Sequence, residues 1–338
     1  MPRCGSQVIL CDLPIRFDTY KGCSHLCSYC FTRKKADLNK IAPMEGVEAL
    51  RNFINGKRSQ ETSWCDWNIP IHWGGMSDPF QPIEKDLKRS LECLKLLAET
   101  QYPFVVSTKG SLIAEGEYLE LIKRCNCVVQ ISMICSSYDV LEQGAPSFEK
   151  RLEMAKAISP HKRVIARVQP YLVELHSEIM TSLERMAEAG IYGVTVEGMK
   201  FERKRDTSLV KVGGDFVYPL DVIEPLFYEL RDKAHSLGMK FYSGENRLRR
   251  LGDSLCCCGI DELEGFKGND FNLNHIVHGD KVSPTDRMKR VGSAECFITL
   301  FQKTVGRRGL KKESFETSMM YMLSRTPEKI KVIFGIKK

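Results

Sequence analysis

The sequence predicts an α/β protein built as a full or partial parallel (β/α) barrel, and three observations support this prediction. From residue 70 onward, short β-branched or apolar segments alternate with segments of helical period. About seven such strands follow one another in the same βα order, which favours a barrel over an open sheet. Unusual polar residues also fall at the carboxyl ends of the expected strands, where such folds carry out their chemistry.

Each expected strand is a short apolar segment, and the segments between them place apolar residues at the helical spacing of about 3.6. The expected strands are Val8 to Tyr20, Ile69 to Trp73, Phe104 to Thr108, Val128 to Met133, Val164 to Val168, Gly193 to Glu197 and Lys240 to Ser243. Expected helices include Met44 to Ile54 and the segments 87–98 and 222–230. The regular alternation stops near residue 245, without a low-complexity linker. We therefore expect a barrel core over 1–245 and a C-terminal extension, 246–338, packed on it.

Composition sets broad limits on the function. At 338 residues and 43% hydrophobic content, the chain can bury a large core. A formal charge of +7 permits a polyanionic partner without requiring one. The first residues lack the pattern of a secretory signal, and no apolar run reaches the length of a membrane span. We therefore expect a cytoplasmic protein without a membrane partner, whose 14 cysteines are reduced thiols and in part metal ligands.

Three cysteines stand out in the segment YKGCSHLCSYCFTRKK. Cys23, Cys27 and Cys30 have C-x3-C-x2-C spacing in a loop expected between a strand and a helix. Thiolates on so short a loop can converge on one iron-sulfur cluster. Three ligands on a four-iron cluster leave one iron open, whereas a zinc site needs a fourth ligand, for which His25 is the candidate.

This triplet resembles the defining loop of the radical SAM superfamily, which has the same spacing and an aromatic residue before the last cysteine, here Tyr29. The resemblance covers roughly residues 8–245. It implies a [4Fe-4S] cluster whose open iron chelates S-adenosylmethionine (SAM), and an electron donor such as a flavodoxin or ferredoxin. Reductive cleavage of SAM then gives a 5′-deoxyadenosyl radical.

The segment IHWGGMSDPFQPIE adds a second likeness. Gly74 and Gly75 at a strand end permit close approach of another group, and they match the radical SAM glycine motif that binds the methionyl amino group. Met76 stands where the motif usually has an acid, so that contact falls to backbone carbonyls or to Ser77 and Asp78. A tight turn without a ligand is the alternative.

The string SDPFQPIE resembles the branch of the superfamily related to spore photoproduct lyase, which repairs DNA. Asp78 and Glu84 are its ionisable members, and either could instead cap the following helix. In that branch, the positions of Ser107 and Lys109 in VVSTKG contribute a hydroxyl and a cation near the SAM carboxylate or ribose.

Two later strands also carry polar residues at their carboxyl ends. Arg167 and Gln169 share one face of a strand, and Glu197 ends the next strand. Polar side chains in otherwise apolar barrel strands indicate a lined cavity, to which we assign Gln169 and Glu197 as cofactor-binding residues.

The run Cys256, Cys257 and Cys258 follows the last strand. With Cys296 or Cys65 it could hold a second iron-sulfur cluster, although adjacent cysteines diverge. Buried free thiols are a further alternative. The likeness to spore photoproduct lyase instead favours Cys257 or Cys258 as a catalytic hydrogen-atom donor.

The substrate class rests on basic residues near two strand ends. These are Lys200, Arg203, Lys204, Arg205, Arg247, Arg249 and Arg250. A basic rim of this kind could face phosphates, which makes nucleic acid the first substrate class and a solvated charge run its alternative. Radical chemistry on a peptide or small metabolite, or a non-catalytic iron-sulfur or zinc redox sensor, remain open. The sequence gives no indication of oligomeric state.

Overall fold

The computed structural model describes residues 1–4, 10–34, 37–59, 62, 65, 68–212, 215–269, 272, 274, 275 and 278. Within them, eight strands form one sheet in the order β1-β2-β5-β6-β7-β8-β9-β12. Seven of these strands are parallel, and β1 pairs antiparallel with β2 at one edge. The strands are β1 (Arg3–Cys4), β2 (Ile15–Phe17), β5 (Ile71–Trp73), β6 (Phe104–Thr108), β7 (Cys127–Ser132), β8 (Val164–Tyr171), β9 (Gly193–Gly198) and β12 (Lys240–Ser243).

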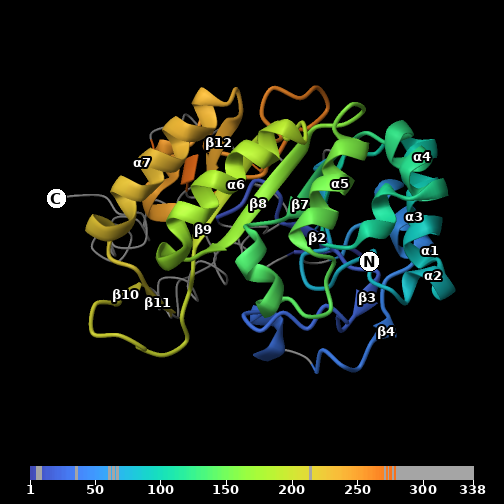
Figure 1. Ribbon diagram of the computed structural model, residues 1–338. Coiled ribbons are helices and arrows are strands. Elements are labelled where there is room, and N and C mark those ends of the chain that lie inside the picture. The colour runs from blue at the N-terminus through green and yellow to red at the C-terminus, as the bar shows by residue number, and fades with distance from the viewer. Residues whose placement is uncertain are drawn as a thin grey trace, which may run out of the picture.

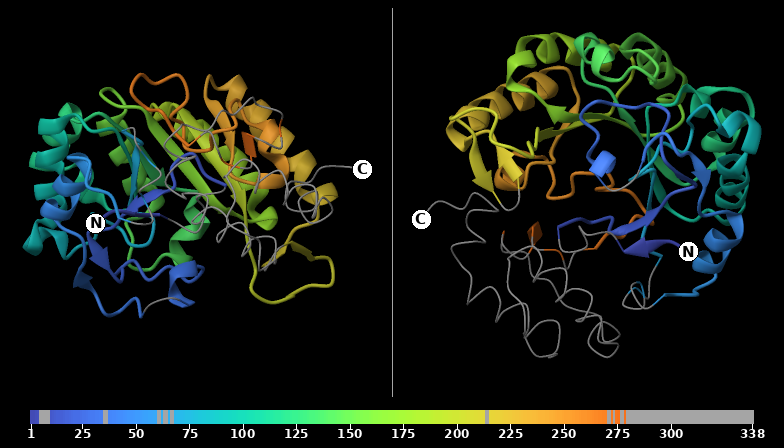
Figure 2. Two further views of the ribbon diagram at one scale, coloured as in Figure 1. Left: turned by 180° about the vertical axis from the view of Figure 1, so that it is seen from behind. Right: turned by 90° about the horizontal axis from the view of Figure 1, so that it is seen from below.

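The sheet curves into an arc, with the helices on its convex side (Figures 1 and 2). The helices are α1 (Val47–Ile54), α2 (Glu84–Leu87), α3 (Arg89–Thr100), α4 (Gly116–Arg124), α5 (Phe148–Ile158), α6 (His176–Glu188) and α7 (Leu220–Ser236). Strands β1 and β12 end the order of the described strands, so the barrel is partial rather than closed. This confirms the predicted parallel α/β architecture.

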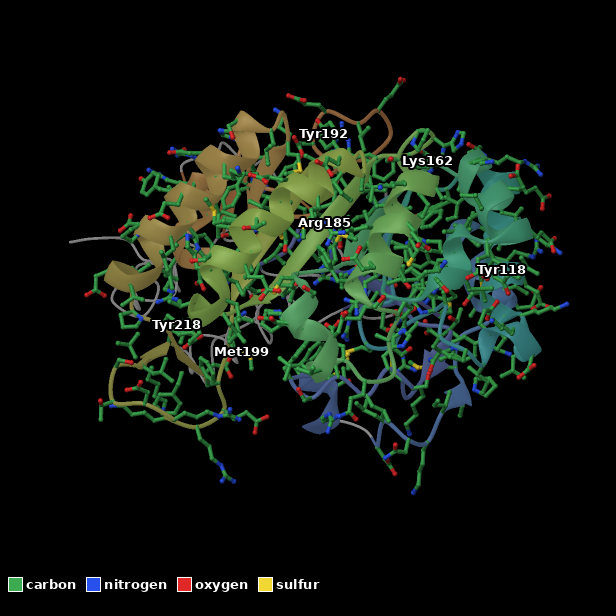
Figure 3. The ribbon with its side chains drawn as sticks, in the orientation of Figure 1. Tyr118, Lys162, Arg185, Tyr192, Met199 and Tyr218 are labelled. Atoms are coloured by element: carbon green, nitrogen blue, oxygen red, sulfur yellow. The ribbon has the colours of Figure 1, made fainter. Side chains whose placement is uncertain are left out.

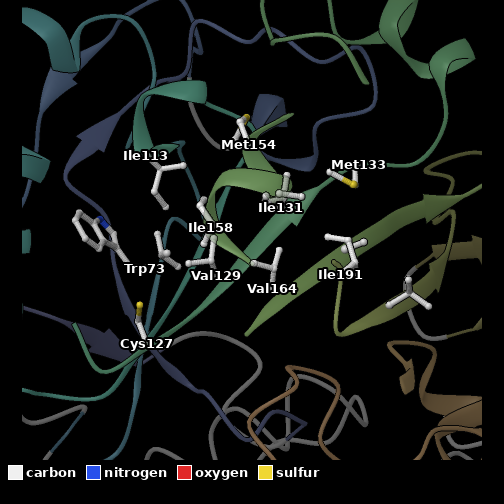
Figure 4. Close-up of a cluster of buried hydrophobic side chains, with 14 of the residues drawn as sticks. Trp73, Ile113, Cys127, Val129, Ile131, Met133, Met154, Ile158, Val164 and Ile191 are labelled. Carbon is white, nitrogen blue, oxygen red and sulfur yellow. The ribbon is translucent and has the colours of Figure 1, made fainter. Parts of the chain in front are cut away.

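The main hydrophobic core lies between the sheet and the helices. Val129 and Ile131 of β7 and Val164 of β8 lie in one cluster with Met154 and Ile158 of α5 (Figure 4). Burial of each such side chain stabilises the fold by about 1.5–3 kcal/mol. Strand β6 is buried at every position, which explains why its sequence shows no polar alternation.

A smaller core lies on the other face of the sheet, inside the arc. Three neighbouring strands each contribute one apolar side chain to it: Val105 of β6, Val128 of β7 and Ile165 of β8. These side chains pack against Cys258 and Phe266. The chain after β12 therefore folds back across the barrel interior, as the orange segment of Figure 2 shows. The proposed division at residue 245 stays a prediction, because most of 246–338 lies outside the described residues.

The predicted elements differ from the observed ones mainly at the two sides of the cysteine loop. The strand predicted over Val8 to Tyr20 is only β2, Ile15–Phe17, and Val8 lies outside the described residues. Helix α1 begins at Val47 rather than at Met44. Two short hairpins were not predicted: β3 (Tyr20–Lys21) with β4 (Ala42–Pro43), and β10 (Val210–Val212) with β11 (Asp215–Val217). None of the described helices is both long and apolar enough to cross a bilayer.

Candidate functional site

The β3–β4 hairpin closes the loop that carries the cysteine triplet. The backbone N–H of Cys23 donates to Leu38 O at 3.0 Å, and that of Cys30 donates to Cys27 O at 3.1 Å. Cys27 is buried, whereas Cys23 and Cys30 are partly exposed, and all three are free thiols. Burial raises the pKa of Cys23 to about 12, and burial together with Glu142 raises the pKa of Cys27.

A single carboxylate, that of Asp78, joins the three segments expected to form the cofactor site. It accepts hydrogen bonds from the backbone N–H of Lys109 at 2.6 Å and from the Thr108 hydroxyl at 2.7 Å, both at the end of β6. It also accepts one from the N–H of Phe80 at 2.9 Å, and it lies 3.1 Å from Nε2 of His25 in the cysteine loop. Asp78 therefore holds these segments together.

The charge of Asp78 is stabilised by these neighbours. Burial by itself would raise the pKa of this carboxyl group, but His25 and the hydrogen bonds from Lys109 and Thr108 hold it well below its usual range. The other ring nitrogen of His25 faces the carbonyl of Gly144 at 3.0 Å. Each ring nitrogen of His25 thus has an oxygen atom within 3.1 Å, which argues against the alternative of His25 as a fourth zinc ligand.

A neighbouring residue, Gln81, clamps the start of the cysteine loop. Its Oε1 accepts from the N–H of Ser24 at 3.0 Å, and its Nε2 donates to Gly22 O at 3.2 Å, on either side of Cys23. Glu84 is fully buried and accepts from the N–H groups of Ser90 and Leu91 at 2.9 Å. Glu84 therefore caps α3, as the alternative interpretation of SDPFQPIE proposed.

The glycine loop is fixed by a second buried acid that the sequence did not single out. Asp18 accepts from the N–H groups of Met76 at 2.9 Å and Ser77 at 3.3 Å. Burial raises the pKa of Asp18 to about 6 despite these bonds. Gly74 has φ +86°, and a Cβ there would lie 2.3 Å from Ser107 O, so this position requires glycine.

Behind Cys27 lies a buried cluster of charges around Glu142. The Tyr29 hydroxyl and Arg151 both donate hydrogen bonds to the Glu142 carboxylate, and Lys109 Nζ lies 3.6 Å from it. Glu142 and Arg151 are each 1% exposed. The side chains of Tyr29 and Lys109 are therefore held by Glu142, while Lys109 and Arg151 place positive charge near the Cys27 thiol.

The triplet fits an iron-sulfur cluster better than a single metal ion. Among the described residues, no three His, Cys, Asp or Glu side chains are gathered closely enough to hold one ion. The cysteines of a cluster bind different irons and need not meet at one point. Three free thiols on one loop, with Lys109 and Arg151 beside Cys27, are a suitable donor set for an anionic cluster.

Inside the arc, polar side chains from four strands form a continuous network. Gln130 Nε2 donates to Cys258 O at 3.1 Å, so its Oε1 faces Ser107 and accepts from that hydroxyl at 2.8 Å. Arg167 Nη1 donates to the same hydroxyl at 3.0 Å, and His72 Nε2 lies 2.8 Å from it. Burial, Arg167 and Arg16 lower the pKa of His72 to about 3. His72 is therefore neutral. Because the Ser107 hydroxyl donates its hydrogen to Gln130, it accepts from His72, which assigns the Nε2–H tautomer.

The network continues through the polar residues predicted on β8 and β9. Arg167 donates to Gln169, Gln169 donates to Glu197, and Glu197 pairs with Lys200. Ser107, Gln169 and Glu197 are thus brought together inside the barrel. Tyr29, Lys109 and Asp78 belong instead to the contacts around the cysteine loop.

The C-terminal cysteines do not meet Cys65, one of the two partners expected for a second cluster. Cys65 is buried in the main core between sheet and helices, whereas Cys256 and Cys258 pack inside the arc. Cys65 therefore cannot complete a site with them, and Cys296 lies outside the described residues. Among the described residues, Cys11, which the sequence did not indicate, has its side chain within hydrogen-bonding reach of Cys258.

The expected basic rim is only partly formed. Arg203, Lys204 and Arg205 are exposed on the segment between β9 and β10. Figure 1 shows that this arm and the cysteine loop extend on the same side of the molecule, and Figure 3 shows Met199 and Tyr218 at its base. Arg247 and Arg249 are buried, contrary to the prediction, because Arg247 pairs with Glu245 and Arg249 packs beside Cys257.

Comparisons with known proteins agree with this fold. No family model matches the chain. Uncharacterized proteins of Mycobacterium bovis and Mycobacterium tuberculosis are 26% identical to it over 202 residues, which is 55% of this chain and 59% of theirs. The chain thus spans well under two thirds of the length of these curated relatives.

Two solved structures of spore photoproduct lyase are similar in fold. A variant of that enzyme superposes with a TM-score of 0.56 at 16% identity, covering 68% of this chain and 76% of the enzyme. The enzyme complexed with dinucleoside spore photoproduct also gives 0.56, at 15% identity over 68% and 77%. The predicted likeness to spore photoproduct lyase is confirmed for the fold.

The Asp78 network generates a prediction about acid stability. Because the folded-state pKa of Asp78 lies below its unfolded value, this residue stabilises the fold above about pH 4 and loses that effect as the pH falls further. Asp78→Asn should therefore lower the free energy of unfolding at pH 7 by on the order of 3 kcal/mol. The difference from the natural protein should shrink between about pH 4 and pH 2.

Urea denaturation followed by circular dichroism measures this difference at each pH. Comparing variant and natural protein cancels the contribution of Asp18, whose raised pKa acts in the opposite sense. Asp86→Asn, at an exposed acid of α2, is the control and should change little. A constant difference from pH 7 to pH 3 would contradict the role given to the Asp78 charge.

Proposed function

We propose that this chain is a radical SAM enzyme that binds a [4Fe-4S] cluster through Cys23, Cys27 and Cys30. The observation that carries the proposal is the position of the triplet. It lies on a loop at the carboxyl end of a partial parallel barrel whose fold is that of spore photoproduct lyase. A redox sensor would need the thiols but not the polar interior beside them.

When bound, the cluster would pass one electron to SAM, giving methionine and a 5′-deoxyadenosyl radical that abstracts hydrogen from the substrate. A flavodoxin or ferredoxin is the electron donor that we propose. The structure of spore photoproduct lyase with bound AdoMet and dinucleoside spore photoproduct supports SAM as the cofactor.

The chain's own residues would bind and orient SAM in two ways. Ser107, Gln169 and Glu197 offer hydrogen-bonding groups inside the barrel, held in place by Arg167. The backbone of Gly74, Gly75 and Met76 would offer carbonyl groups to the amino group of SAM, since Asp18 fixes the conformation of this loop.

Four other residues that the sequence predicts to bind the cofactor would instead hold in place the segments that surround the site. Asp78 and Ser77 hold the glycine loop against the cysteine loop, since the Ser77 hydroxyl donates to Tyr20 O. Tyr29 and Lys109 meet at Glu142 next to Cys27, where Lys109 would offset the negative charge of the cluster. These positions suit a role in shaping the SAM pocket.

We propose Cys257 or Cys258 as the hydrogen-atom donor to the substrate radical. The carbonyl of Cys258 is hydrogen-bonded to Gln130, which contacts Ser107, so this segment lies at the floor of the same polar interior. A thiol is a suitable hydrogen donor to a carbon radical, and Cys257 is partly exposed.

Nucleic acid is the substrate class that the charges favour. The exposed Arg203, Lys204 and Arg205 extend on the side of the cysteine loop, which would bring phosphates to the cluster side of the barrel. The dinucleoside bound by spore photoproduct lyase supports this choice.

The cluster assignment predicts a specific loss of iron. Anaerobically reconstituted protein should hold about four irons per chain and cleave SAM to 5′-deoxyadenosine when reduced. Replacement of Cys23, Cys27 and Cys30 by Ala should abolish both, because no described thiol can replace them on that loop. Iron analysis and chromatography of the products measure the two effects.

Cys125→Ala, which removes a buried thiol elsewhere, is the control and should retain the iron. Full iron in the triple variant would refute the assignment. Zinc in place of iron would favour the redox-sensor alternative.

The substrate assignment predicts a salt effect. Binding of duplex DNA should weaken steeply with salt, because neutralised phosphates release counterions. Changing Arg203, Lys204 and Arg205 to Ala should make the slope of log K against log salt less steep by up to about 2.7, corresponding to about three phosphate contacts. Cleavage of SAM without substrate should stay unchanged. Fluorescence anisotropy from about 50 to 200 mM salt measures the slope.

Three exposed basic residues provide the matched control: Lys88 between α2 and α3, Arg124 of α4 and Lys156 of α5. Their replacement should leave the slope almost unchanged. No binding of DNA or RNA at about 50 mM salt would move the proposal to a peptide or a small metabolite.

A further inference from the structure

Four thiols gather inside the barrel, away from the cysteine triplet. We call Cys11, Cys256, Cys257 and Cys258 the four-thiol group; Cys11 comes from the segment before β2, and the others follow β12. Cys257 Sγ lies 3.9 Å from Cys258 Sγ, and the N–H of Cys258 donates to Cys256 Sγ at 3.3 Å. The Cys11 side chain lies within hydrogen-bonding reach of Cys258. The fold thus joins two chain segments that are distant in sequence through their thiols.

A buried arginine accompanies this group. Arg249 is 3% exposed, and its Nη2 donates to Asn246 Oδ1 at 2.9 Å. Its Nε and Nη1 have no hydrogen-bond partner of normal geometry among the described residues. The guanidinium lies against Cys257, with Cys11 also nearby. Cys257 and the carboxylate of Asp12 are the anionic groups that act on this buried cation, and Cys257 acts on it more strongly.

The thiols of this group are not equivalent. The hydrogen bond from Cys258, together with Arg249, lowers the pKa of Cys257 to about 6, although burial and the negative charge of Asp12 oppose this. The pKa values of Cys256 and Cys258 are raised. Cys257 is also partly exposed, whereas Cys256 and Cys258 are buried. Reactivity toward an oxidant is therefore concentrated on one sulfur atom.

The geometry of adjacent cysteines determines which thiol can close a disulfide. Neighbouring Cα atoms are about 3.8 Å apart, less than the usual 4.4–6.8 Å of a disulfide. Bridges from Cys257 to Cys256 or Cys258 are therefore strained. Cys11 is the member of the group on a separate segment, and its side chain contacts Cys258, whose Sγ lies 3.9 Å from that of Cys257.

We propose that Cys257 and Cys11 form a dithiol that is oxidised by hydroperoxides. The Cys257 thiolate attacks the hydroperoxide, so that an S–O bond forms, the O–O bond breaks, and an alcohol or water leaves after taking up one proton. The Cys11 thiol then attacks the sulfenic sulfur, forming the disulfide and releasing water. The two thiols are oxidised by two electrons in total, and the hydroperoxide is reduced. This site does not depend on the proposed cluster or on SAM.

Peptide mapping of the full chain tests the disulfide. The anaerobic protein is treated with about one equivalent of hydrogen peroxide, alkylated and digested with trypsin. The expected product is peptide 4–16 joined to peptide 251–267, with fragment spectra that place the bond on Cys11 rather than on Cys4. In Cys11→Ser the joined peptide should disappear, and dimedone should trap the sulfenic acid at Cys257. Absence of the joined peptide from the natural protein would overturn the proposal.

The rate of alkylation tests the role of Arg249. Iodoacetamide should modify Cys257 with a midpoint near pH 6, far faster at pH 7 than the buried Cys125, whose pKa burial raises to about 12. Arg249→Met should slow the reaction at pH 7 by about 10-fold or more, while Arg250→Met, at the exposed neighbour, should leave it unchanged. Equal rates at Cys257 and Cys125 would overturn the proposal. The proposal would also be overturned if iron protected Cys257 from alkylation and this iron were lost when Cys256, Cys257 and Cys258 are changed to Ala. These thiols would then be iron ligands.

Discussion

The buried charge of Asp78 is the interaction on which the rest of the site depends. Its carboxylate contacts the cysteine loop through His25, the end of β6 through Thr108 and Lys109, and its own loop through Phe80. Each partner belongs to a segment that a parallel barrel brings to one end of the sheet. Because a buried carboxylate is costly unless it is fully hydrogen-bonded, these segments are stable mainly in the arrangement that satisfies it.

Buried polar side chains in the barrel interior are likewise satisfied by hydrogen bonds to one another. The inner face of the sheet changes from apolar residues, such as Val105 and Ile165, to polar residues, such as Ser107 and Arg167, two positions further along the same strands. The apolar half is covered by the chain after β12. The polar half is satisfied by internal hydrogen bonds, which hold neutral and charged groups in fixed orientations next to the cysteine loop. Such a preorganised interior suits a cofactor that carries its own reactive chemistry.

The sequence predicted the strands well because each buried parallel strand is a continuous apolar run, as in Phe104–Thr108. It also predicted that Arg167, Gln169 and Glu197 line one cavity, since strand alternation fixes the face of each side chain. It did not connect Ser107 with them, which the hydrogen bond from Arg167 does. It could not indicate Glu142 or Cys11, because Tyr29 and Cys258, which contact them, are distant in sequence. The buried state of Arg247 and Arg249 was missed for a different reason: a run of basic residues does not indicate whether a nearby acid such as Glu245 will pair with one of them in the interior.

The most direct test of the account is whether one iron of the cluster is open to SAM. The full chain reconstituted with 57Fe would be examined by Mössbauer spectroscopy with and without SAM. Three cysteine ligands leave one iron of four without a thiolate, so SAM should change about a quarter of the spectral area. The remaining area should stay as it was. Identical spectra with and without SAM would contradict the central claim, since the cluster would then have no iron available to the cofactor.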